Sequence, residues 1–136
     1  MDVQSTIYQR ETNGIHVTVE PAFLEDQSDP EASHFVWAYT VRIANQTEKP
    51  VRLRARHWQI TDEVGRTEEV MGEGVVGEQP LIEPGTQFEY TSGAPLSTPS
   101  GFMVGTYHME AVNGDLFDVA IPAFSLDSPH EQRRVH

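Results

Sequence analysis

The sequence contains no cysteine and has a small share of basic residues. The absence of cysteine excludes disulfide frameworks, thiolate nucleophiles and cysteine-ligated metal sites. Nine Lys and Arg residues stand against 21 Asp and Glu residues, which gives a formal net charge of −12 at pH 7. Nucleic-acid affinity depends largely on basic side chains that displace counterions from phosphates, so this charge argues against a nucleic-acid partner.

Long apolar segments are also missing. No stretch approaches the roughly 20 apolar residues that a membrane-spanning helix needs. The first 14 residues are polar and do not contain the apolar core of a secretory signal. We therefore expect no membrane association and a cytoplasmic location, which the lack of cysteine also suits.

What is present is the composition of one folded domain. The 136 residues include 38% hydrophobic and 22% charged residues, an ordinary balance for a globular protein. A chain of this length can bury a core without disulfides or metals. No Pro- or Ser-rich linker and no internal repeat divides it. We predict a single domain over residues 1–127, followed by a flexible polar C-terminal tail over residues 128–136.

Three long stretches have the alternating apolar pattern of half-buried strands. They cover residues 15–23, 34–45 and 51–62. In the third stretch the apolar positions change parity, from Val51, Leu53 and Ala55 to Trp58 and Ile60. Such a change predicts a β-bulge, or a strand that crosses from one sheet to another.

Shorter strands are predicted in the second half of the chain. The expected elements are a polar strand ending at Val70, a strand over 87–91, a loop over 92–101, a strand over 102–112, a strand over 115–121 and an edge strand at 124–126. Asn113-Gly114 predicts a type I′ hairpin turn, because both residue types tolerate positive φ angles. About seven or eight short strands, with no convincing helix, predict an all-β sandwich.

A basic segment in the third long strand is the sharpest indication of a binding surface. Arg52, Arg54 and Arg56 share one strand parity, so we expect an exposed basic row beside His57. Such a row could bind a carboxylate or a phosphate group of a partner. The alternative is a solvated strand face whose arginines pair with the protein's own Asp and Glu residues.

A glycine-rich segment follows this strand. Gly72, Gly74 and Gly77 match the GxGxxG pattern of dinucleotide-binding loops. The strand and helix that this pattern requires are missing, and Pro80 would stop a helix almost at once. Two readings stay open: a backbone nest that binds an anion, or glycines that are needed for unusual φ angles in a fixed crossover loop.

Catalytic and metal sites have little support in the sequence. The six histidines show no close ligand spacing, although strand pairing could bring His57 or His108 beside a carboxylate such as Asp62 or Glu110. No serine lies in a nucleophile-elbow pattern, and Glu68 and Glu69 are adjacent on a strand, so their side chains point in opposite directions. We expect no enzymatic activity, no metal and no cofactor.

Several motifs together resemble the ApaG family of small bacterial proteins. They span most of the chain, in order: Arg56-His57-Trp58, Gly72-Glu73-Gly74-Val75-Val76-Gly77-Glu78-Gln79-Pro80, Pro84-Gly85, Tyr90-Thr91-Ser92-Gly93, Leu96, Gly101, Met103, Gly105-Thr106-Tyr107 and Ile121-Pro122. The resemblance implies a fibronectin type III-like or immunoglobulin-like β-sandwich and no established enzymatic activity. It also implies an association of some members with cobalt and magnesium efflux.

These observations favour a non-enzymatic interaction domain of ApaG type. The expected binding residues are Arg54, Arg56, His57, Gly72, Gly74 and Gly77. The expected partner is an unidentified protein, with a homodimer or a small anionic ligand as other options. The alternative function is a binder of pyrophosphate, a nucleotide polyphosphate or a divalent metal, linked to cobalt and magnesium homeostasis.

Overall fold

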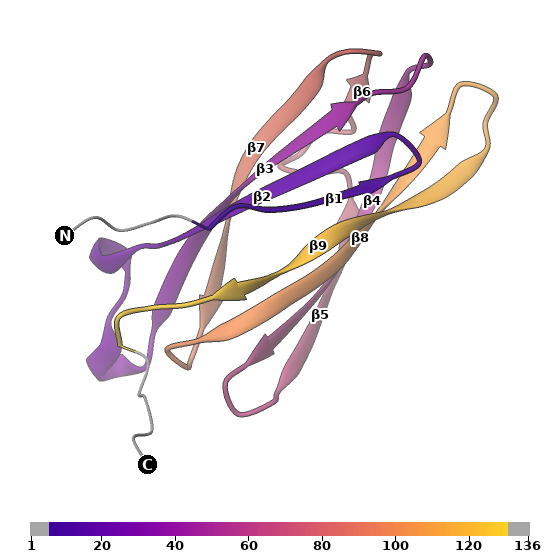
Figure 1. Cartoon of the computed structure of the whole chain (residues 1–136). Helices are drawn as coiled ribbons and strands as arrows, with labels where there is room; N and C mark the ends of the chain where they lie inside the picture. Colours follow the sequence, from indigo (N-terminus) through magenta and orange to yellow (C-terminus); the bar gives the residue numbers. More distant parts are fainter. Residues whose placement is uncertain (1–5, 131–136) are drawn as a thin grey trace.

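The computed structural model describes residues 6–130, and these residues form an all-β fold (Figure 1). The strands are β1 (Tyr8–Thr12), β2 (Ile15–Phe23), β3 (Phe35–Asn45), β4 (Val51–Asp62), β5 (Thr67–Glu73), β6 (Leu81–Ile82), β7 (Gln87–Leu96), β8 (Gly101–Ala111) and β9 (Leu116–Leu126). The predicted all-β class is confirmed.

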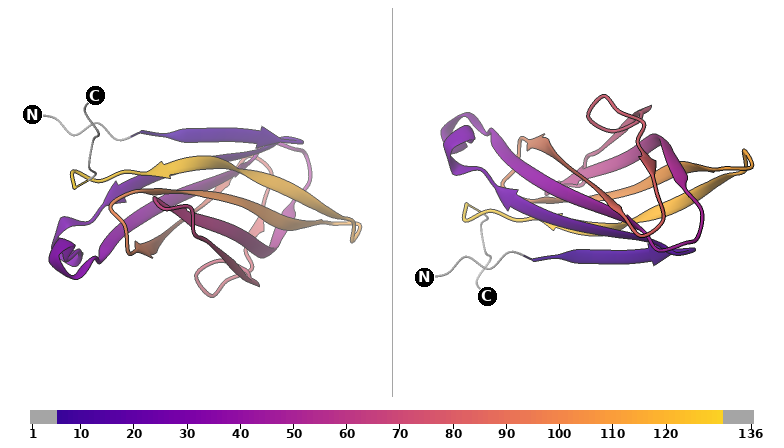
Figure 2. Two further views of the ribbon diagram at one scale, coloured as in Figure 1. Left: turned by 90° about the horizontal axis from the view of Figure 1, so that it is seen from below. Right: turned by 90° about the horizontal axis from the view of Figure 1, so that it is seen from above.

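The strands form two antiparallel sheets that face one another (Figure 2). The first sheet has the order β1-β2-β3-β7, and the second has the order β5-β4-β8-β9, with the short β6 also paired to β4. At one side β9 packs against β1 and β2. The molecule is therefore the predicted sandwich, with nine strands in the described residues where seven or eight were expected.

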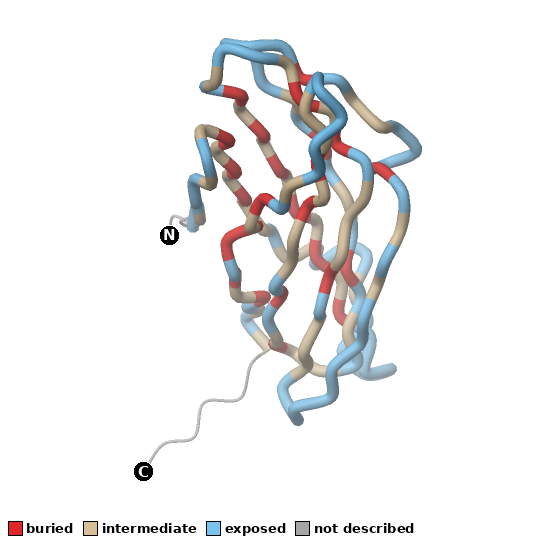
Figure 3. The backbone as a smooth tube through the Cα atoms, turned by 90° about the vertical axis from the view of Figure 1, so that its right-hand side faces the viewer, coloured by how far each residue is buried: buried red, intermediate tan, exposed pale blue. Residues whose placement is uncertain are grey.

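Alternation along the strands builds the core between the sheets. In β3 every second residue is buried, from Phe35 to Asn45, and Figure 3 shows the same alternation as red and tan segments of the tube. The largest fully buried side chains include Trp37, Trp58 and Tyr107. Replacing a buried aromatic side chain of this size with alanine typically lowers the free energy of unfolding by about 3–5 kcal/mol. Alternation along β3 thus places Phe35, Trp37 and Tyr39 in the core, whereas Phe102, an aromatic residue of β8 also expected there, is 47% exposed.

The predicted parity change in β4 is a β-bulge. The pairing of β4 with β8 shifts register between Leu53 and Ala55, so Arg54 is the additional residue. Beyond the bulge the even-numbered residues face the core, and Trp58 is buried opposite Gly105. A Cβ atom on Gly105 would lie 2.6 Å from Cε3 of Trp58, so only glycine leaves room for this indole.

Two Asn-Gly pairs form turns of different types. Asn13 and Gly14 both have positive φ, 50° and 84°, and join β1 to β2 in the manner of a type I′ turn. This hairpin was missed, because residues 8–12 are polar and show no apolar alternation. The predicted hairpin at Asn113-Gly114 is confirmed, but only Gly114 has a positive φ. The prediction of a type I′ turn at Asn113-Gly114 is therefore wrong.

Two predicted boundaries in the second half are also wrong. The segment 92–101 is not one loop, because β7 continues to Leu96 by pairing with β3. The separate edge strand at 124–126 is a continuation of β9. Pro122 interrupts the ladder without ending the strand, because Pro122 and Ala123 stand opposite the single residue Val104 in a bulge.

The segment after β9 folds back onto the first sheet. Ser128 Oγ donates a hydrogen bond to Pro99 O at 2.6 Å, and the His130 ring packs against Phe23 and Phe35. His130 Nε2 lies 3.0 Å from Glu25 Oε1. Ser128 and His130 thus contact the sandwich, and residues 131–136 of the predicted tail lie outside the described residues. Within residues 6–130, no helix is long and apolar enough to cross a membrane.

Candidate functional site

The bulge in β4 places Arg54 and Arg56 on different sides of the sheet. Arg54 is exposed, and its Nε donates a hydrogen bond to Glu110 Oε1. Arg56 stands beside Tyr107, which faces the core and has no exposed surface. The single exposed row predicted for Arg52, Arg54 and Arg56 is therefore wrong, because the inserted residue reverses the parity.

Arg56 reaches over β5 toward the glycine-rich segment. Its Nη1 donates hydrogen bonds to Gly74 O at 2.7 Å and to Glu73 O at 3.2 Å. A Cβ atom on Gly72 would lie 2.9 Å from this Nη1, so glycine at this position makes room for the guanidinium group. No carboxylate of residues 6–130 lies within 4.0 Å of it, unlike the carboxylates that pair with Arg42 and Arg54.

Three buried tyrosines surround the inner side of this guanidinium group. Tyr39 lies on β3, Tyr90 on β7 and Tyr107 on β8, and the hydroxyl groups of Tyr90 and Tyr107 hydrogen-bond to each other across the sandwich. Burial raises the pKa of all three hydroxyl groups, most strongly in Tyr90 and Tyr107, while the nearby charge of Arg56 acts in the opposite direction. The tyrosines are thus neutral near pH 7, and Arg56 is the charged group of the cluster.

The glycine-rich turn, residues 72–78, is a tight hairpin rather than a phosphate loop. Val76 and Gly77 have φ angles of 43° and 82°, and backbone hydrogen bonds join Val75 and Glu78 in both directions, at 2.8 and 2.9 Å. Gly74 also has a positive φ, and its N–H donates to Arg54 O. The prediction of unusual φ angles is confirmed for Gly74 and Gly77 but not for Gly72, and the amide groups of residues 74, 75 and 78 are already occupied.

The tip of the glycine-rich turn presents an apolar side chain. Val75 is buried at 1% exposure and anchors the turn, whereas the next residue, Val76, is 53% exposed. Met71 on β5 and Leu81 on β6, the strands that flank the turn, are also exposed. Gln79 connects the turn to β4, because its Nε2 donates to Arg54 O at 2.8 Å.

His57 lies on the outer face of the second sheet, away from Arg56. Its Nε2 is 3.4 Å from Glu69 Oε2, with no hydrogen bond formed. His108 Nδ1 lies 2.7 Å from Asp118 Oδ1, so strand pairing does bring both histidines beside a carboxylate, although the carboxylates are Glu69 and Asp118 and not Asp62 or Glu110. Among the described residues, no group of three or more His, Asp or Glu side chains is arranged to hold a metal ion.

Two features of the structure were missed from the sequence. Asn45 is a fully buried polar residue at the end of β3. Its place in the inward-facing parity of that strand is the signal that could have revealed it. A cavity of about 510 Å³ lies at one end of the sandwich, where the segment before β1, the end of β2 and the segment after β9 meet. No sequence signal indicated this cavity.

The family of the chain follows from comparison with known proteins. The family model described as the ApaG domain matches residues 25–111, which include the bulge and the glycine-rich turn. The chain belongs to the ApaG family. Its relatives include Protein ApaG of Paramagnetospirillum magneticum, 60% identical over 96% of this chain and 100% of that protein. Protein ApaG of Parvibaculum lavamentivorans is 57% identical with the same coverage.

Solved structures agree with this family membership. A crystal structure of a protein designated ApaA from Bordetella pertussis is 50% identical and superposes with a TM-score of 0.83, covering 86% of this chain and 95% of that chain. An X-ray structure of a structural genomics target, SoR45, has 44% identity and a TM-score of 0.81 over 91% of this chain and 96% of the other. The ApaG sandwich thus accounts for nearly the whole of the described fold.

Proposed function

We propose that this ApaG-family domain is a non-enzymatic, cytoplasmic protein-interaction module. Its contact surface comprises the glycine-rich turn, residues 72–78, together with Arg54 and Gln79 beside it. The observation that carries the proposal is Val76, an exposed β-branched residue held at a positive φ. Its partner is a protein with an apolar socket and carboxylate groups near it.

Val76 has an unfavourable backbone conformation that the rest of the turn enforces. A β-branched residue in the left-handed region costs about 1–2 kcal/mol relative to glycine. The paired hydrogen bonds between Val75 and Glu78, and the buried Val75 side chain, hold the turn in place. An apolar side chain on a rigid support loses little conformational entropy when a partner covers it, which favours binding.

Charged and polar groups surround this apolar tip in the manner of an interface rim. Arg54 bonds to Glu110 at the surface, where exchange for a partner carboxylate costs little. Gln79 lies between Arg54 and the turn, with Arg54 Nη1 donating to its Oε1 at 3.4 Å. An apolar centre with a polar rim is the usual anatomy of a protein interface.

Replacing Val76 with glycine is expected to weaken partner binding while leaving the fold intact. Glycine relieves the positive φ, so the free energy of unfolding should stay within about 1 kcal/mol of the wild-type value. Loss of the exposed side chain should reduce affinity about tenfold, which corresponds to about 1.4 kcal/mol. Arg54→Glu should weaken the same complex. Urea unfolding and a binding titration with the captured partner measure the two effects.

A photo-crosslinking amino acid at position 76 identifies that partner directly. The matched control places the same amino acid at Thr91, an exposed residue of β7 in the other sheet. A species crosslinked from position 76 but not from position 91 supports the proposal, and its mass distinguishes another protein from a second copy of this chain. Equal crosslinking from both positions, or full binding by Val76→Gly, would refute it.

A small-anion binder is the second candidate, favoured by the state of Arg56. Only Nη1 of this guanidinium group donates hydrogen bonds within residues 6–130, and no carboxylate neutralises it there. Pyrophosphate or a nucleotide polyphosphate would supply the missing negative charge and accept from the remaining donors. This candidate keeps the proposed link to cobalt and magnesium homeostasis.

For this candidate we expect saturating pyrophosphate to raise the melting temperature of the wild-type domain. Ligand at 100 times its Kd adds about 2.7 kcal/mol of stability by mass action. Arg56→Met should abolish the shift, whereas Arg42→Met, which removes the same charge from the other sheet, should keep it. Parallel titrations with Mg²⁺ and Co²⁺ test the metal link. An unchanged melting temperature of the wild-type domain in these titrations would contradict the small-anion function. It would leave the protein-interaction function unaffected.

A further inference from the structure

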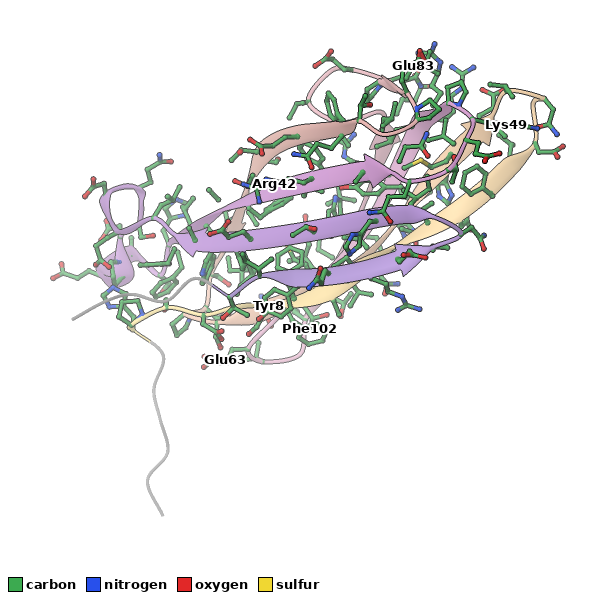
Figure 4. All side chains as sticks on the ribbon, turned by 45° about the horizontal axis from the view of Figure 1, so that its top comes forward. Tyr8, Arg42, Lys49, Glu63, Glu83 and Phe102 are labelled. Carbon is green, nitrogen blue, oxygen red and sulfur yellow. The ribbon has the colours of Figure 1, made fainter. Side chains whose placement is uncertain are left out.

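The cavity of about 510 Å³ at the end of the sandwich has the size of a small-molecule site. Because β1 begins at Tyr8, opposite Val19, the edge of β2 that faces away from β3 has no strand partner among residues 6–130 from Pro21 to Phe23. Figure 4 labels Tyr8 at this end of the sheet. The segment after β9 passes across the opening and completes the walls.

Aromatic rings supply much of the cavity wall. Tyr8, Phe23 and Trp37 all line it, and the rings of Phe23 and Trp37 meet edge to face with centroids 5.3 Å apart. Trp37 Nε1 donates to Asp127 O at 2.8 Å, which fixes the segment after β9 against β3. The ring arrangement is therefore held by packing and hydrogen bonding before any ligand arrives.

The charges at the cavity are negative. The lining residues include Glu25 and Asp127, and no Lys or Arg of residues 6–130 lines the cavity. Glu25 is paired with His130 at 3.0 Å. Within residues 6–130 the side-chain carboxylate of Asp127 accepts only from Ser125 Oγ, at 2.7 Å, and it has no cationic side chain of these residues within 4.0 Å. This carboxylate is thus available to a ligand.

We propose that this cavity binds a cation carried on a short apolar body, such as a primary amine or a guanidinium group. The aromatic faces attract a cation and cover the apolar body, while Asp127 pairs with the charge. An anion would meet two carboxylates, and a neutral ligand would leave Asp127 unpaired. This site lies outside the contact surface proposed for the glycine-rich turn, so the two proposals stand independently.

Two sources can supply such a cation. One is a free amine in solution, and the other is the chain itself, which continues beyond His130 with Arg133 and Arg134. Pro129 lines the cavity, and the three residues from His130 to Arg133 span at most about 10 Å. Both sources share the same chemistry, so the experiment has an arm for each.

The test compares three ligands that differ mainly in charge: tyramine, 2-(4-hydroxyphenyl)ethanol and 4-hydroxyphenylacetate. Calorimetric titration of the full chain should show the amine binding about tenfold more tightly than the neutral alcohol, with the acid weakest. Asp127→Asn should remove this preference for the amine. Glu83→Gln makes the same charge change at a loop far from Tyr8, as Figure 4 shows, and should leave it unchanged.

Glu25→Gln serves as a second variant should Asp127→Asn fail to fold, and it should also reduce the preference for the amine. The double variant Arg133→Gln/Arg134→Gln distinguishes the sources: tighter amine binding means that the chain's own arginines compete for the cavity, and unchanged binding assigns the site to a free amine. Equal affinity for all three ligands, retention of the amine preference in Asp127→Asn, or no amine binding by either the wild-type chain or the double variant would overturn the proposal.

Discussion

Replacing Asn45 with alanine is expected to lower the free energy of unfolding by about 3–5 kcal/mol. The side chain is fully buried. Its Nδ2 donates to Lys49 O at 2.8 Å and to Ile82 O at 2.9 Å, and its Oδ1 accepts from the backbone N–H of Thr47 at 2.9 Å. Alanine would leave these backbone groups without partners, and each buried unsatisfied group costs about 1–3 kcal/mol.

The expected loss of stability is large because Asn45 joins three parts of the fold. It ends β3, closes the turn that leads into β4, and holds β6 through Ile82 O. Its backbone N–H and C=O also pair with Thr86 and Gly85, at the turn before β7. Removing the side chain therefore loosens connections in both sheets at once.

Asn113→Ala is the matched control. Asn113 makes similar local hydrogen bonds, to Asp115 at 2.9 and 3.1 Å, but in the exposed turn between β8 and β9. Water can replace these bonds, so we expect a loss below about 1 kcal/mol. Urea unfolding followed by tryptophan fluorescence measures both variants. Equal losses of unfolding free energy in the two variants would show that the burial of Asn45 adds nothing to its effect on stability.

Alkaline pH is the second condition with a large expected effect. Stability should fall steeply as the pH rises above about 10, because the unfolded chain then releases tyrosine protons that the folded chain retains. The folded-state pKa values of Tyr39, Tyr90 and Tyr107 lie above the ordinary value of 10.0, primarily because of burial. Their stabilising contribution is complete below pH 10 and is lost as the pH climbs toward the raised values.

The size of this effect follows from the number of protons involved. Each retained proton changes stability by about 1.4 kcal/mol per pH unit, so three tyrosines give a slope of up to about 4 kcal/mol per pH unit. Chemical unfolding at a series of pH values between 8 and 11 measures the slope. Simultaneous absorbance near 295 nm reports whether the buried phenols ionise only as the chain unfolds.

The double variant Tyr90→Phe/Tyr107→Phe isolates the cause. Both hydroxyl groups of the buried pair disappear together, so neither is left without its partner and the core keeps its shape. The slope above pH 10 should fall to about one third of the wild-type value. An unchanged slope would assign the alkaline loss to groups outside the tyrosine cluster.

The sequence allowed much of the fold to be predicted, because strand alternation directly reflects burial. The strands over 15–23 and 51–62 were predicted with the bounds that the structure shows. The change of parity predicted between Ala55 and Trp58 correctly indicated a bulge in β4, although the bulge lies before Ala55, between Leu53 and Ala55. The apolar pattern is informative wherever one face of a strand packs against the core and the other meets solvent.

Prediction was weaker where long-range packing and strand pairing, and not the local sequence pattern, determine the structure. Arg56 was expected on the exposed face because Ala55 was counted with the core-facing residues, which placed the parity change after Ala55, whereas the additional residue is Arg54. β1 is short and polar, and it forms by pairing with β2. The end cavity forms where three segments that are distant in the sequence meet, and no local sequence pattern indicates such a meeting.

The glycine-rich turn has one more consequence, for the solubility of the protein. β5 pairs with β4 only as far as Ala55, and β6 pairs only with Val51 and Arg52. Between them, Pro80 O accepts from Leu53 N–H and Gly74 N–H donates to Arg54 O, so the loop closes a gap that would otherwise be an open strand edge. A chain with this loop shortened would offer that edge to other copies, and aggregation would then compete with folding.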